Sequence, residues 1–400
     1  MEAIYISSCI PYNGKSGGRL ASYNHLLKLS EEYSQVYAFF VDVEYDAVDF
    51  KEESIPSNIK VTIFEREIKP VRNLYTAFIA IFRNIFSLFP RSMDVVYSKR
   101  MIAEIRKLYT RNKNIPIILD HFDAFSNLYK FDDLNILYVA HNNESELIYQ
   151  KIFFDKKVNF LFNYLNYIKT KYFEKILLTR SLKIIFISSY DYDNFPVYKH
   201  KSIIFPEFIK LKEKKWKIDD VKDRSILFLG SSTHYPNKEA TLWLINTFAP
   251  LLYDIDPSIK INVCGLLKDS LNISNNYPKN LNFLGRVNDE HLESLFLSSR
   301  VFLSPVTLGS GVKIKVLESA SYCLPVFLTP ESLRGLSYLY GKIHTTERQD
   351  VHNFLNEFLL FFNDDFSLLN QSNQLFEILS ELQKDNTRYF TYLSEKKSLE

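Results

Sequence analysis

The stretch of sequence that decides the fold is Ser304-Pro305-Val306-Thr307-Leu308-Gly309-Ser310-Gly311-Val312-Lys313-Ile314-Lys315-Val316-Leu317-Glu318. It follows an apolar strand predicted at 300–303 and runs into a helix predicted at 312–322. Its glycines therefore lie where a strand turns into a helix. Such a turn presents unpaired backbone N–H groups at the positive end of a helix, which favours a bound phosphate.

Two charged side chains follow these glycines. Lys315 and Glu318 are three residues apart and share a face of the predicted helix. A cation beside a diphosphate and a carboxylate that accepts two ribose hydroxyls would form a nucleotide site. A glycine-containing loop before a solvated, charged helix start explains the same residues, so this stretch alone does not separate the two readings.

Composition bounds the class of protein. A chain of 400 residues with 46% hydrophobic content predicts two globular domains. The net charge of +2 offers no large basic excess, so we expect no nucleic-acid partner. The N-terminus shows no signal peptide, and Cys9, Cys264 and Cys323 have no metal-ligand spacing. These features predict a reduced, cytoplasmic protein without disulfides or structural zinc.

Glycine is scarce, with ten residues in 400, well below the usual ~7%. Most of the glycines follow a short apolar run, where a parallel strand would deliver the chain to a ligand crevice. Their placement indicates that the backbone at these positions requires glycine, either for its conformation or for close approach to a ligand. The glycines are Gly14, Gly17, Gly18, Gly230, Gly265, Gly285, Gly309, Gly311, Gly335 and Gly341.

The first half of the chain alternates strands and helices, which predicts a parallel sheet. A helix is predicted at 19–32. Polar clusters at 120–123 and 141–144 follow two of the strands, where a crevice is expected. The predicted strands are 3–9, 36–43, 59–64, 93–98, 115–120, 134–140, 183–188 and 203–205.

An unusually apolar helix is predicted at 73–89, with arginines and a lysine around it. It is too short and interrupted to span a membrane. It is either a buried helix of the first domain or an interfacial helix whose basic flanks meet anionic lipid. A helical segment at 145–180, rich in Phe, Tyr and Lys, offers a second membrane-facing candidate at 151–175.

A charged segment at 210–224 reads as an interdomain linker. A second alternation of strands and helices follows it. We therefore divide the chain into residues 1–208 as an N-terminal domain, 209–224 as a linker, 225–345 as a second domain and 346–400 as C-terminal helices. The strands of the second domain are predicted at 225–230, 260–264, 281–284, 300–303 and 325–328, and its helices at 239–253, 289–298 and 312–322.

The order and spacing of several motifs resemble the second domain of glycosyltransferase family 4. The resemblance covers about residues 225–336, and Gly17-Gly18 and 141–144 resemble landmarks of the family's first domain. The motifs are Gly230-Ser231 with Pro236-Asn237, Val263-Cys264-Gly265, Phe283-Leu284-Gly285-Arg286-Val287, Pro305 with residues 309–318, and Leu324-Pro325-Val326 with Gly335-Leu336.

This resemblance implies an α/β chain with the GT-B fold, in which two Rossmann-like, doubly wound parallel-sheet domains face each other across a cleft and C-terminal helices pack back. It implies a retaining glycosyltransferase that needs no metal and no cofactor. Its partners would be a nucleotide-sugar donor of the UDP or GDP type and a glycan or lipid-linked acceptor in surface polysaccharide synthesis. Peripheral contact with the inner face of the membrane through 73–89 would fit such an acceptor.

The resemblance also implies site residues. Glu318 matches the glutamate that holds the ribose, and Gly309, Ser310, Gly311 and Val312 would bring backbone to the diphosphate or sugar. The segment Gly285-Arg286-Val287 would line the base, and Gly17-Gly18 would close on the donor phosphates. Gly230 with Asn237 belongs to the first motif of the second domain.

The sequence departs from the family pattern at several positions. Ser310 replaces a sugar-gripping glutamate, and Ser231 replaces an arginine. We therefore expect Lys313 and Lys315, with Lys238 in reserve, to meet the diphosphate charge. Cys323 stands where glycine is usual, which predicts slight strain at a helix end.

The acceptor-side catalytic group has no clear motif. The histidine expected near residues 98–100 is absent, and His141 and His121 are the nearest substitutes. Each is equally explained as a satisfied histidine at a strand end. A non-catalytic nucleotide-sugar-binding subunit is the alternative function, whereas a Rossmann dehydrogenase is disfavoured because neither domain opens with Gly-x-Gly-x-x-Gly.

Overall fold

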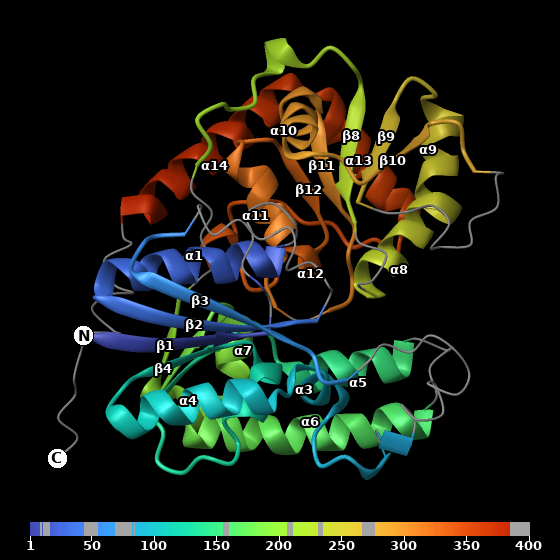
Figure 1. Cartoon of the computed structure of the whole chain (residues 1–400). Coiled ribbons are helices and arrows are strands. Elements are labelled where there is room, and N and C mark those ends of the chain that lie inside the picture. Colours follow the sequence, from blue (N-terminus) through green and yellow to red (C-terminus); the bar gives the residue numbers. More distant parts are fainter. Residues whose placement is uncertain are drawn as a thin grey trace. The chain divides into compact units, whose positions relative to one another are not determined.

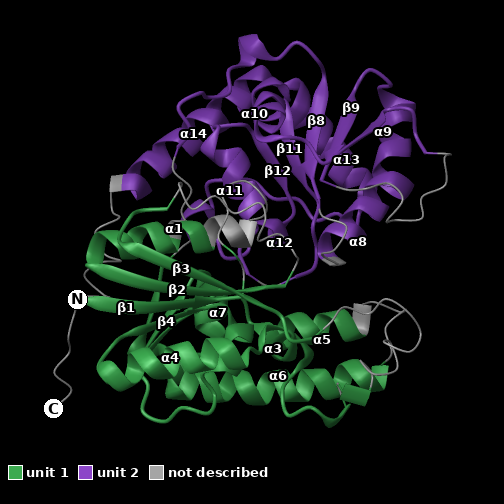
Figure 2. Ribbon diagram, viewed as in Figure 1, with its two compact units in different colours: residues 1–206 green, residues 207–400 purple. Residues whose placement is uncertain are grey.

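The chain folds into two compact units, Met1–Pro206 and Glu207–Glu400 (Figures 1 and 2). The structure is a computed structural model. It describes residues 1–8, 10, 17–43, 55–68, 82–83, 85–154, 160–205, 211–230, 235–265, 277–309 and 311–384.

Unit 1 is built on a seven-stranded parallel sheet in the order β3-β2-β1-β4-β5-β6-β7. The strand order reverses between β1 and β4, where Ser7 lies opposite Asp120. In open parallel sheets such a reversal is where ligands bind, at the carboxyl ends of the strands. The strands are β1 Glu2–Ser7, β2 Gln35–Asp42, β3 Ile59–Glu65, β4 Ile117–Asp120, β5 Ile136–Ala140, β6 Lys183–Phe186 and β7 Ser202–Ile204.

Helices cover this sheet (Figure 1). Buried apolar side chains of β1, β4 and β5 pack with Met93, Ile105, Phe173 and Leu177 into one core. The helices of unit 1 are α1 Gly17–Glu32, α3 Arg91–Val96, α4 Lys99–Arg111, α5 Glu144–Phe154, α6 Phe160–Arg180 and α7 Ser189–Asn194, with 3-10 turns at Phe122–Asn127 and Pro196–Lys201.

The strand predicted at 93–98 is wrong, because Arg91–Val96 forms helix α3. The adjacent valines 95 and 96 favour a strand by propensity, but Pro90 precedes the segment and its carbonyl accepts the N–H of Asp94 at 3.0 Å. Met93 and Val96, three residues apart, are both buried, which is a helical spacing.

The helix predicted at 73–89 falls partly outside the described residues. Within them, helical turns occur at 82–83 and 85–86, and the chain is no longer helical from Ser87 onward. Pro90 disfavours helical backbone at Phe89, the residue before it, so the predicted helix cannot readily continue to its predicted end. The buried interpretation is wrong for this part, because Phe82 and Phe86 are 56% and 69% exposed. Only Phe89 enters the core.

Unit 2 holds a five-stranded parallel sheet in the order β10-β9-β8-β11-β12. The strands are β8 Ser225–Leu229, β9 Lys260–Cys264, β10 Leu281–Gly285, β11 Val301–Ser304 and β12 Val326–Leu328. The helices are α8 Tyr235–Trp243, continued through a π-helical turn at Leu244–Phe248 into α9 Ala249–Ile255, then α10 Asp289–Ser298, α11 Ile314–Ser321, α12 Pro330–Leu333, α13 Val351–Asn363 and α14 Asp365–Lys384.

The C-terminal helices belong to the core of unit 2. Phe327 of β12 contacts the rings of Phe354 and Phe358 edge-on at 5.1 and 5.3 Å. Short 3-10 turns occur at Ile218–Asp220 and Ser337–Leu339. None of the helices in the described part of the chain is long and apolar enough to cross a membrane.

Part of the segment predicted as a linker also packs onto unit 2. The indole N–H of Trp216, a buried side chain, donates to the carbonyl of Ser299 at 2.8 Å. The backbone N–H of Trp216 donates to the carbonyl of Tyr322 at 2.7 Å. The strain predicted at Cys323 is confirmed, since its φ of 58° places it in the left-handed region after α11.

Candidate functional site

The first candidate site lies in unit 2, between the end of β11 and the start of α11. Gly309 and Gly311 have φ angles of 105° and 69°, which favour glycine. A side chain at Gly309 would place its Cβ 3.0 Å from Cγ of Pro236. The loop therefore depends on glycine at this position and brings bare backbone to the edge of the sheet.

Lys315 places its ammonium group inside unit 2. Its Nζ donates to the carbonyl of Leu229, the last residue of β8, at 3.2 Å. Burial lowers the pKa of Lys315 to about 8, and the charge of Glu318 opposes this shift. The amine is mainly protonated at pH 7 and supplies a positive charge at the carboxyl edge of the sheet.

Glu318 lies one helical turn beyond Lys315 in α11. Burial raises the pKa of its carboxyl group, while the charges of Lys212 and Lys315 lower it. The two site residues are thus electrostatically coupled. A carboxylate that water reaches poorly gains more from accepting ligand hydroxyls than an exposed one would.

Sequence reasoning missed Arg334, which contacts the same loop. Its Nη1 donates to the carbonyl of Gly309 at 3.2 Å, and its Nε lies 3.1 Å from Oε1 of Glu331. Nζ of Lys313 lies 3.9 Å from that same oxygen and donates to the carbonyl of Gly311 at 3.2 Å. Lys313 and Arg334 therefore form a cationic pair around Glu331 beside the glycine loop.

Arg348 is a second missed cation. It is buried, and its Nη2 donates to Oγ1 of Thr307 at 2.8 Å and to the carboxylate of Glu239. Its guanidinium lies 5.0 Å from the ring centroid of Trp243. Its Nη1 is buried without a hydrogen-bond partner among the described residues. Arg348 follows Thr307 by 41 residues, so no local sequence pattern indicated that the two side chains would meet.

The remaining predicted residues of unit 2 lie along the same sheet edge or in α8. A Cβ at Gly265 would come 2.2 Å from the carbonyl oxygen of Gly230, so these strand ends touch backbone to backbone. Gly285 ends β10, and Arg286 after it is exposed. Asn237, Lys238 and Val312 are partly exposed. Ser310 and Ser231 lie outside the described residues.

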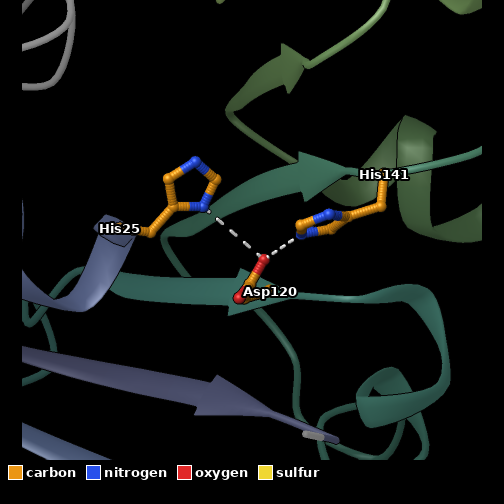
Figure 3. A group of neighbouring side chains, drawn as sticks. All are labelled: His25, Asp120 and His141. Atoms are coloured by element: carbon orange, nitrogen blue, oxygen red, sulfur yellow. Dashed lines mark hydrogen bonds and ion pairs between the residues drawn. The ribbon is translucent and has the colours of Figure 1, made fainter. Parts of the chain in front are cut away.

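The second candidate site lies in unit 1, at the point where the strand order reverses. Asp120, the last residue of β4, is fully buried, and one of its oxygens accepts a hydrogen bond from His141, just after β5. Nδ1 of His25, from α1, lies 3.8 Å from the same oxygen. Figure 3 shows both imidazoles directed at this one carboxylate. The other oxygen accepts the hydroxyl of Tyr5 from β1.

His121 follows Asp120 with a φ of 78°, which is unusual for a residue with a side chain. Its ring stacks on that of His141, with the centroids 4.0 Å apart, and its Nε2 lies 3.1 Å from Oγ of Ser22. Strained backbone of this kind persists where the surroundings enforce it and clusters at functional sites. The structure therefore brings the two predicted histidines together. Gly17 and Gly18 form the start of α1, and their surroundings are not described.

Charge in this cluster resides on Asp120. Burial alone would raise the pKa of its carboxyl group, but His141 and His121 lower it well below its usual range. Burial lowers the pKa of His141 to about 4, so its imidazole is neutral at pH 7. A neutral imidazole that donates its Nε2 proton to Asp120 keeps a lone pair on Nδ1.

Three carboxyl groups of unit 1 with raised pKa values form a neighbouring cluster, in which Asp123 and Glu144 interact with His121. Burial, together with the charges of Asp123 and Glu174, raises the pKa of Glu144 to about 8. Burial raises the pKa of Glu174 to about 7, although it accepts the backbone N–H of Glu144 at 2.7 Å at the start of α5. Burial also raises the pKa of Asp123. Sequence reasoning identified the clusters at 120–123 and 141–144 but gave no role to Tyr5, His25 or Glu174.

His25, Asp120 and His141 form the one group of side chains in the described part of the chain that could hold a metal ion. Their ligand atoms all lie within 4.8 Å of one another. Asp120 already accepts hydrogen bonds from His141 and Tyr5, so its carboxylate is satisfied by protein groups. The expectation that the protein needs no metal stays a prediction.

Comparison with known proteins adds two relationships at the level of sequence. Residues 223–357 match the family described as glycosyl transferases group 1. The matched residues include the glycine loop and α11. A Klebsiella pneumoniae protein described as an uncharacterized 44.6 kDa protein in the cps region is 24% identical over 358 residues. The match covers 85% of this chain and 86% of that protein.

Solved structures resemble the whole chain. TarM matches with a TM-score of 0.67 and 10% identity, over 98% of this chain and 99% of its own. HepE from Anabaena, solved in complex with UDP and glucose, matches with a TM-score of 0.64 and 12% identity, over 99% and 100% of the two chains. At these identities the likeness establishes the fold.

Proposed function

We propose that this chain, a glycosyltransferase of the GT-B fold with a group 1 domain at residues 223–357, transfers a sugar from a nucleotide-sugar donor to a glycan or lipid-linked acceptor. Retention of the anomeric configuration and independence from a bound metal are part of the proposal. The observation that carries it is the partly buried, protonated amine of Lys315 beside a loop with two positive-φ glycines.

Donor binding is assigned to unit 2. The glycine loop is buried at Gly309 and Gly311. We propose that its backbone N–H groups and the amine of Lys315 donate to a diphosphate, and that the carboxylate of Glu318 accepts the ribose hydroxyls. Lys313, Arg334 and Arg348 add positive charge around the loop. Several fixed cations can stabilise the departing nucleoside diphosphate without a metal, because charge develops on that group as the glycosidic bond breaks.

The acceptor side is assigned to unit 1. His121 is the better candidate for a group near the sugar, because its side chain is partly exposed whereas His141 is buried. In this proposal His141 and Asp120 hold the stacked ring of His121 in position. His141 keeps a catalytic role only if acceptor binding exposes it. Gly17 and Gly18 keep their proposed role on the donor phosphates.

The polysaccharide context is also proposed. The Klebsiella relative is described by its cps region, and HepE was solved with UDP and glucose. We therefore propose a UDP-sugar as the first donor to test, before GDP-sugars, with a surface polysaccharide as the product. Action at the inner face of the cell membrane, with contact through 73–89, belongs to the same proposal.

A thermal-shift screen of UDP- and GDP-sugars tests donor binding. A donor at about 100 times its dissociation constant stabilises the folded protein by about 2.7 kcal/mol. We expect one donor to raise the unfolding temperature of the wild type and to lose this effect in Glu318→Ala. Glu377→Ala, in α14, is the matched control. Equal shifts in wild type and Glu318→Ala would refute the assigned site.

A transfer assay separates an enzyme from the alternative, a non-catalytic nucleotide-sugar-binding subunit. The departures Ser310 and Ser231 motivate that alternative. Turnover of the bound donor, by transfer or slow hydrolysis, supports the enzyme, whereas binding without turnover supports the subunit. NMR of the product's anomeric proton tests retention, and activity in a chelator tests metal independence.

A further inference from the structure

Two segments of unit 1 form a continuous outer surface. Nζ of Lys169, in α6, donates to the carbonyls of Ser87 and Ile85 at 2.6 and 3.4 Å. The backbone N–H of Arg91 donates to Oδ1 of Asn166 at 2.9 Å. These bonds fix the segment 82–91 alongside α6. Helix α6 lies on the face of the unit 1 sheet opposite α1 (Figure 1).

Large apolar and aromatic side chains cover this surface. Phe86 is 69% exposed and Leu161 is 77% exposed. Along α6, Phe160, Tyr164, Ile168 and Tyr172 recur every fourth position, which places them on one helix face. We define the α6 face as Phe82, Ile85, Phe86, Leu88, Phe160, Leu161, Tyr164, Ile168 and Tyr172, all exposed.

In its C-terminal half, α6 also contributes side chains to the core. Phe173, Leu177 and Leu178 of this helix are buried in unit 1. An amphipathic helix of a soluble domain normally has one apolar stripe, which faces the core. The exposed residues of α6 form a second apolar stripe, which is contiguous with four exposed apolar residues of segment 82–91. A patch of this size is larger than the single, scattered apolar side chains normal on a protein surface.

The exposed charges of this surface have one sign, because Asp94, which lies 3.9 Å from Nε of Arg83, is buried. Segments 82–91 and 160–172 contain Arg83, Arg91, Lys169 and Lys171 and no Asp or Glu. Long basic side chains beside aromatic rings suit the boundary between lipid headgroups and acyl chains, where tyrosine also concentrates. A two-fold contact between copies would instead place this positive surface against itself.

We infer that the α6 face docks unit 1 on an anionic lipid bilayer, with its apolar side chains in the interface and its lysines and arginines on the headgroups. The inference extends the contact proposed at 73–89 to α6. It gives the proposed transferase a lipid-linked rather than a soluble acceptor. It rests on the proposed function only for that acceptor, because docking itself needs no donor site.

Vesicle co-sedimentation of the full chain tests docking. The vesicles contain phosphatidylcholine alone or phosphatidylcholine with phosphatidylserine at about two to one. We expect the wild type to bind the anionic vesicles and to be released by salt, because screening weakens the attraction. The double variant Phe86→Ser/Leu161→Ser should bind at least about tenfold more weakly, since both side chains leave the interface.

Two further variants sharpen the test. Lys171→Gln/Arg91→Gln should weaken binding to anionic vesicles by about fivefold for each charge removed. Leu360→Ser/Phe366→Ser is the matched control in unit 2, where the two side chains are 75% and 77% exposed. It should bind as the wild type does. All four positions are surface positions, so the folded state should survive each change.

The results decide among the occupants of the face. Failure of the wild type to bind anionic vesicles, or unchanged binding of Phe86→Ser/Leu161→Ser, would overturn the inference. A dimer that dissociates in this variant, without vesicle binding, would identify a contact between copies instead. Donor-induced thermal shifts in the same variants separate this outcome from failure of the proposed function, because the donor site lies in unit 2.

Discussion

The carboxyl group of Glu144 allows the electrostatics of unit 1 to be tested without a substrate. Glu144 begins α5, and Nδ2 of Asn142 donates to its Oε1 at 3.2 Å. Glu144→Gln keeps the shape and this accepted hydrogen bond. In the folded wild type the carboxyl group is mainly protonated at pH 7, because burial raises its pKa to about 8.

The sign of the effect follows from proton binding. Between the ordinary pKa of 4.5 and about 8, the folded state holds a proton that the unfolded state has lost. The free energy of unfolding is therefore unaffected by this group below pH 4.5 and decreases as pH rises toward 8. At pH 7 this decrease approaches about 3 kcal/mol, because each unit of pKa difference corresponds to about 1.4 kcal/mol. Since water reaches part of the side chain, we expect about 1–3 kcal/mol.

Glu144→Gln should remove this loss, so the variant is more stable than the wild type at pH 8 and equal to it near pH 4.5. Both tryptophans, Trp216 and Trp243, lie in unit 2. Hydrogen exchange of peptides from α5 and β5, compared at equal pH, is therefore the suitable assay.

The matched control is Glu104→Gln, a 47% exposed residue of α4 that lies 3.7 Å from Lys107. It should change stability by only a few tenths of a kcal/mol at either pH. A gain in Glu144→Gln that is the same at pH 5 and pH 8, or a loss at pH 8, would refute the argument that this carboxyl group is protonated in the folded state.

Three further predictions concern the two sites. Lys315→Ala should weaken donor binding by about 10- to 100-fold in calorimetry, whereas the control Lys342→Ala should leave donor affinity unchanged. Donor affinity of the wild type should fall as pH rises above about 8, because the amine of Lys315 then loses its proton. Gly265→Ala should lower the free energy of unfolding by about 3 kcal/mol or more, by tryptophan fluorescence in urea, because its Cβ meets the Gly230 carbonyl. Gly341→Ala, with open space around its Cβ, should cost about 1–2 kcal/mol. Asp120→Asn should reduce kcat at least about tenfold and shift the pH–rate profile, with donor affinity within about twofold; an unchanged profile would contradict a positioning role.

The sheet architecture was predictable because parallel strands in this chain are short apolar runs with helices between them. The strand prediction at 93–98 was wrong because the β-propensity of its valines competed with a helix start at Pro90. The buried interpretation of 73–89 was wrong in its described part for a different reason. An apolar helical pattern predicts a helix, but it does not say whether the apolar side chains pack in the core or stay exposed.

The unit 2 loop was predictable because its parts are contiguous in the chain. Gly309, Gly311, Lys315 and Glu318 occupy one strand-to-helix turn, so spacing alone places them together. Arg334 and Arg348 reach the same loop from later segments, through folding that no local pattern encodes. Whether these residues bind a donor stays a prediction.

The unit 1 cluster marks the limit of sequence reasoning more sharply. Asp120 gathers Tyr5, His25 and His141, which span more than a hundred positions of the chain and come from β1, α1 and the end of β5. Each is unremarkable where it stands. Only the reversal of strand order between β1 and β4 brings them to one point, and His121 is then held in left-handed backbone directly beside them. The pKa of Asp120 is held well below its usual range and burial lowers that of His141 to about 4, so neither group takes up a proton readily near pH 7. In the proposed function Asp120 instead holds His141, and through the stacked rings His121, in position, which makes Asp120 the residue of unit 1 whose replacement should reveal most about catalysis.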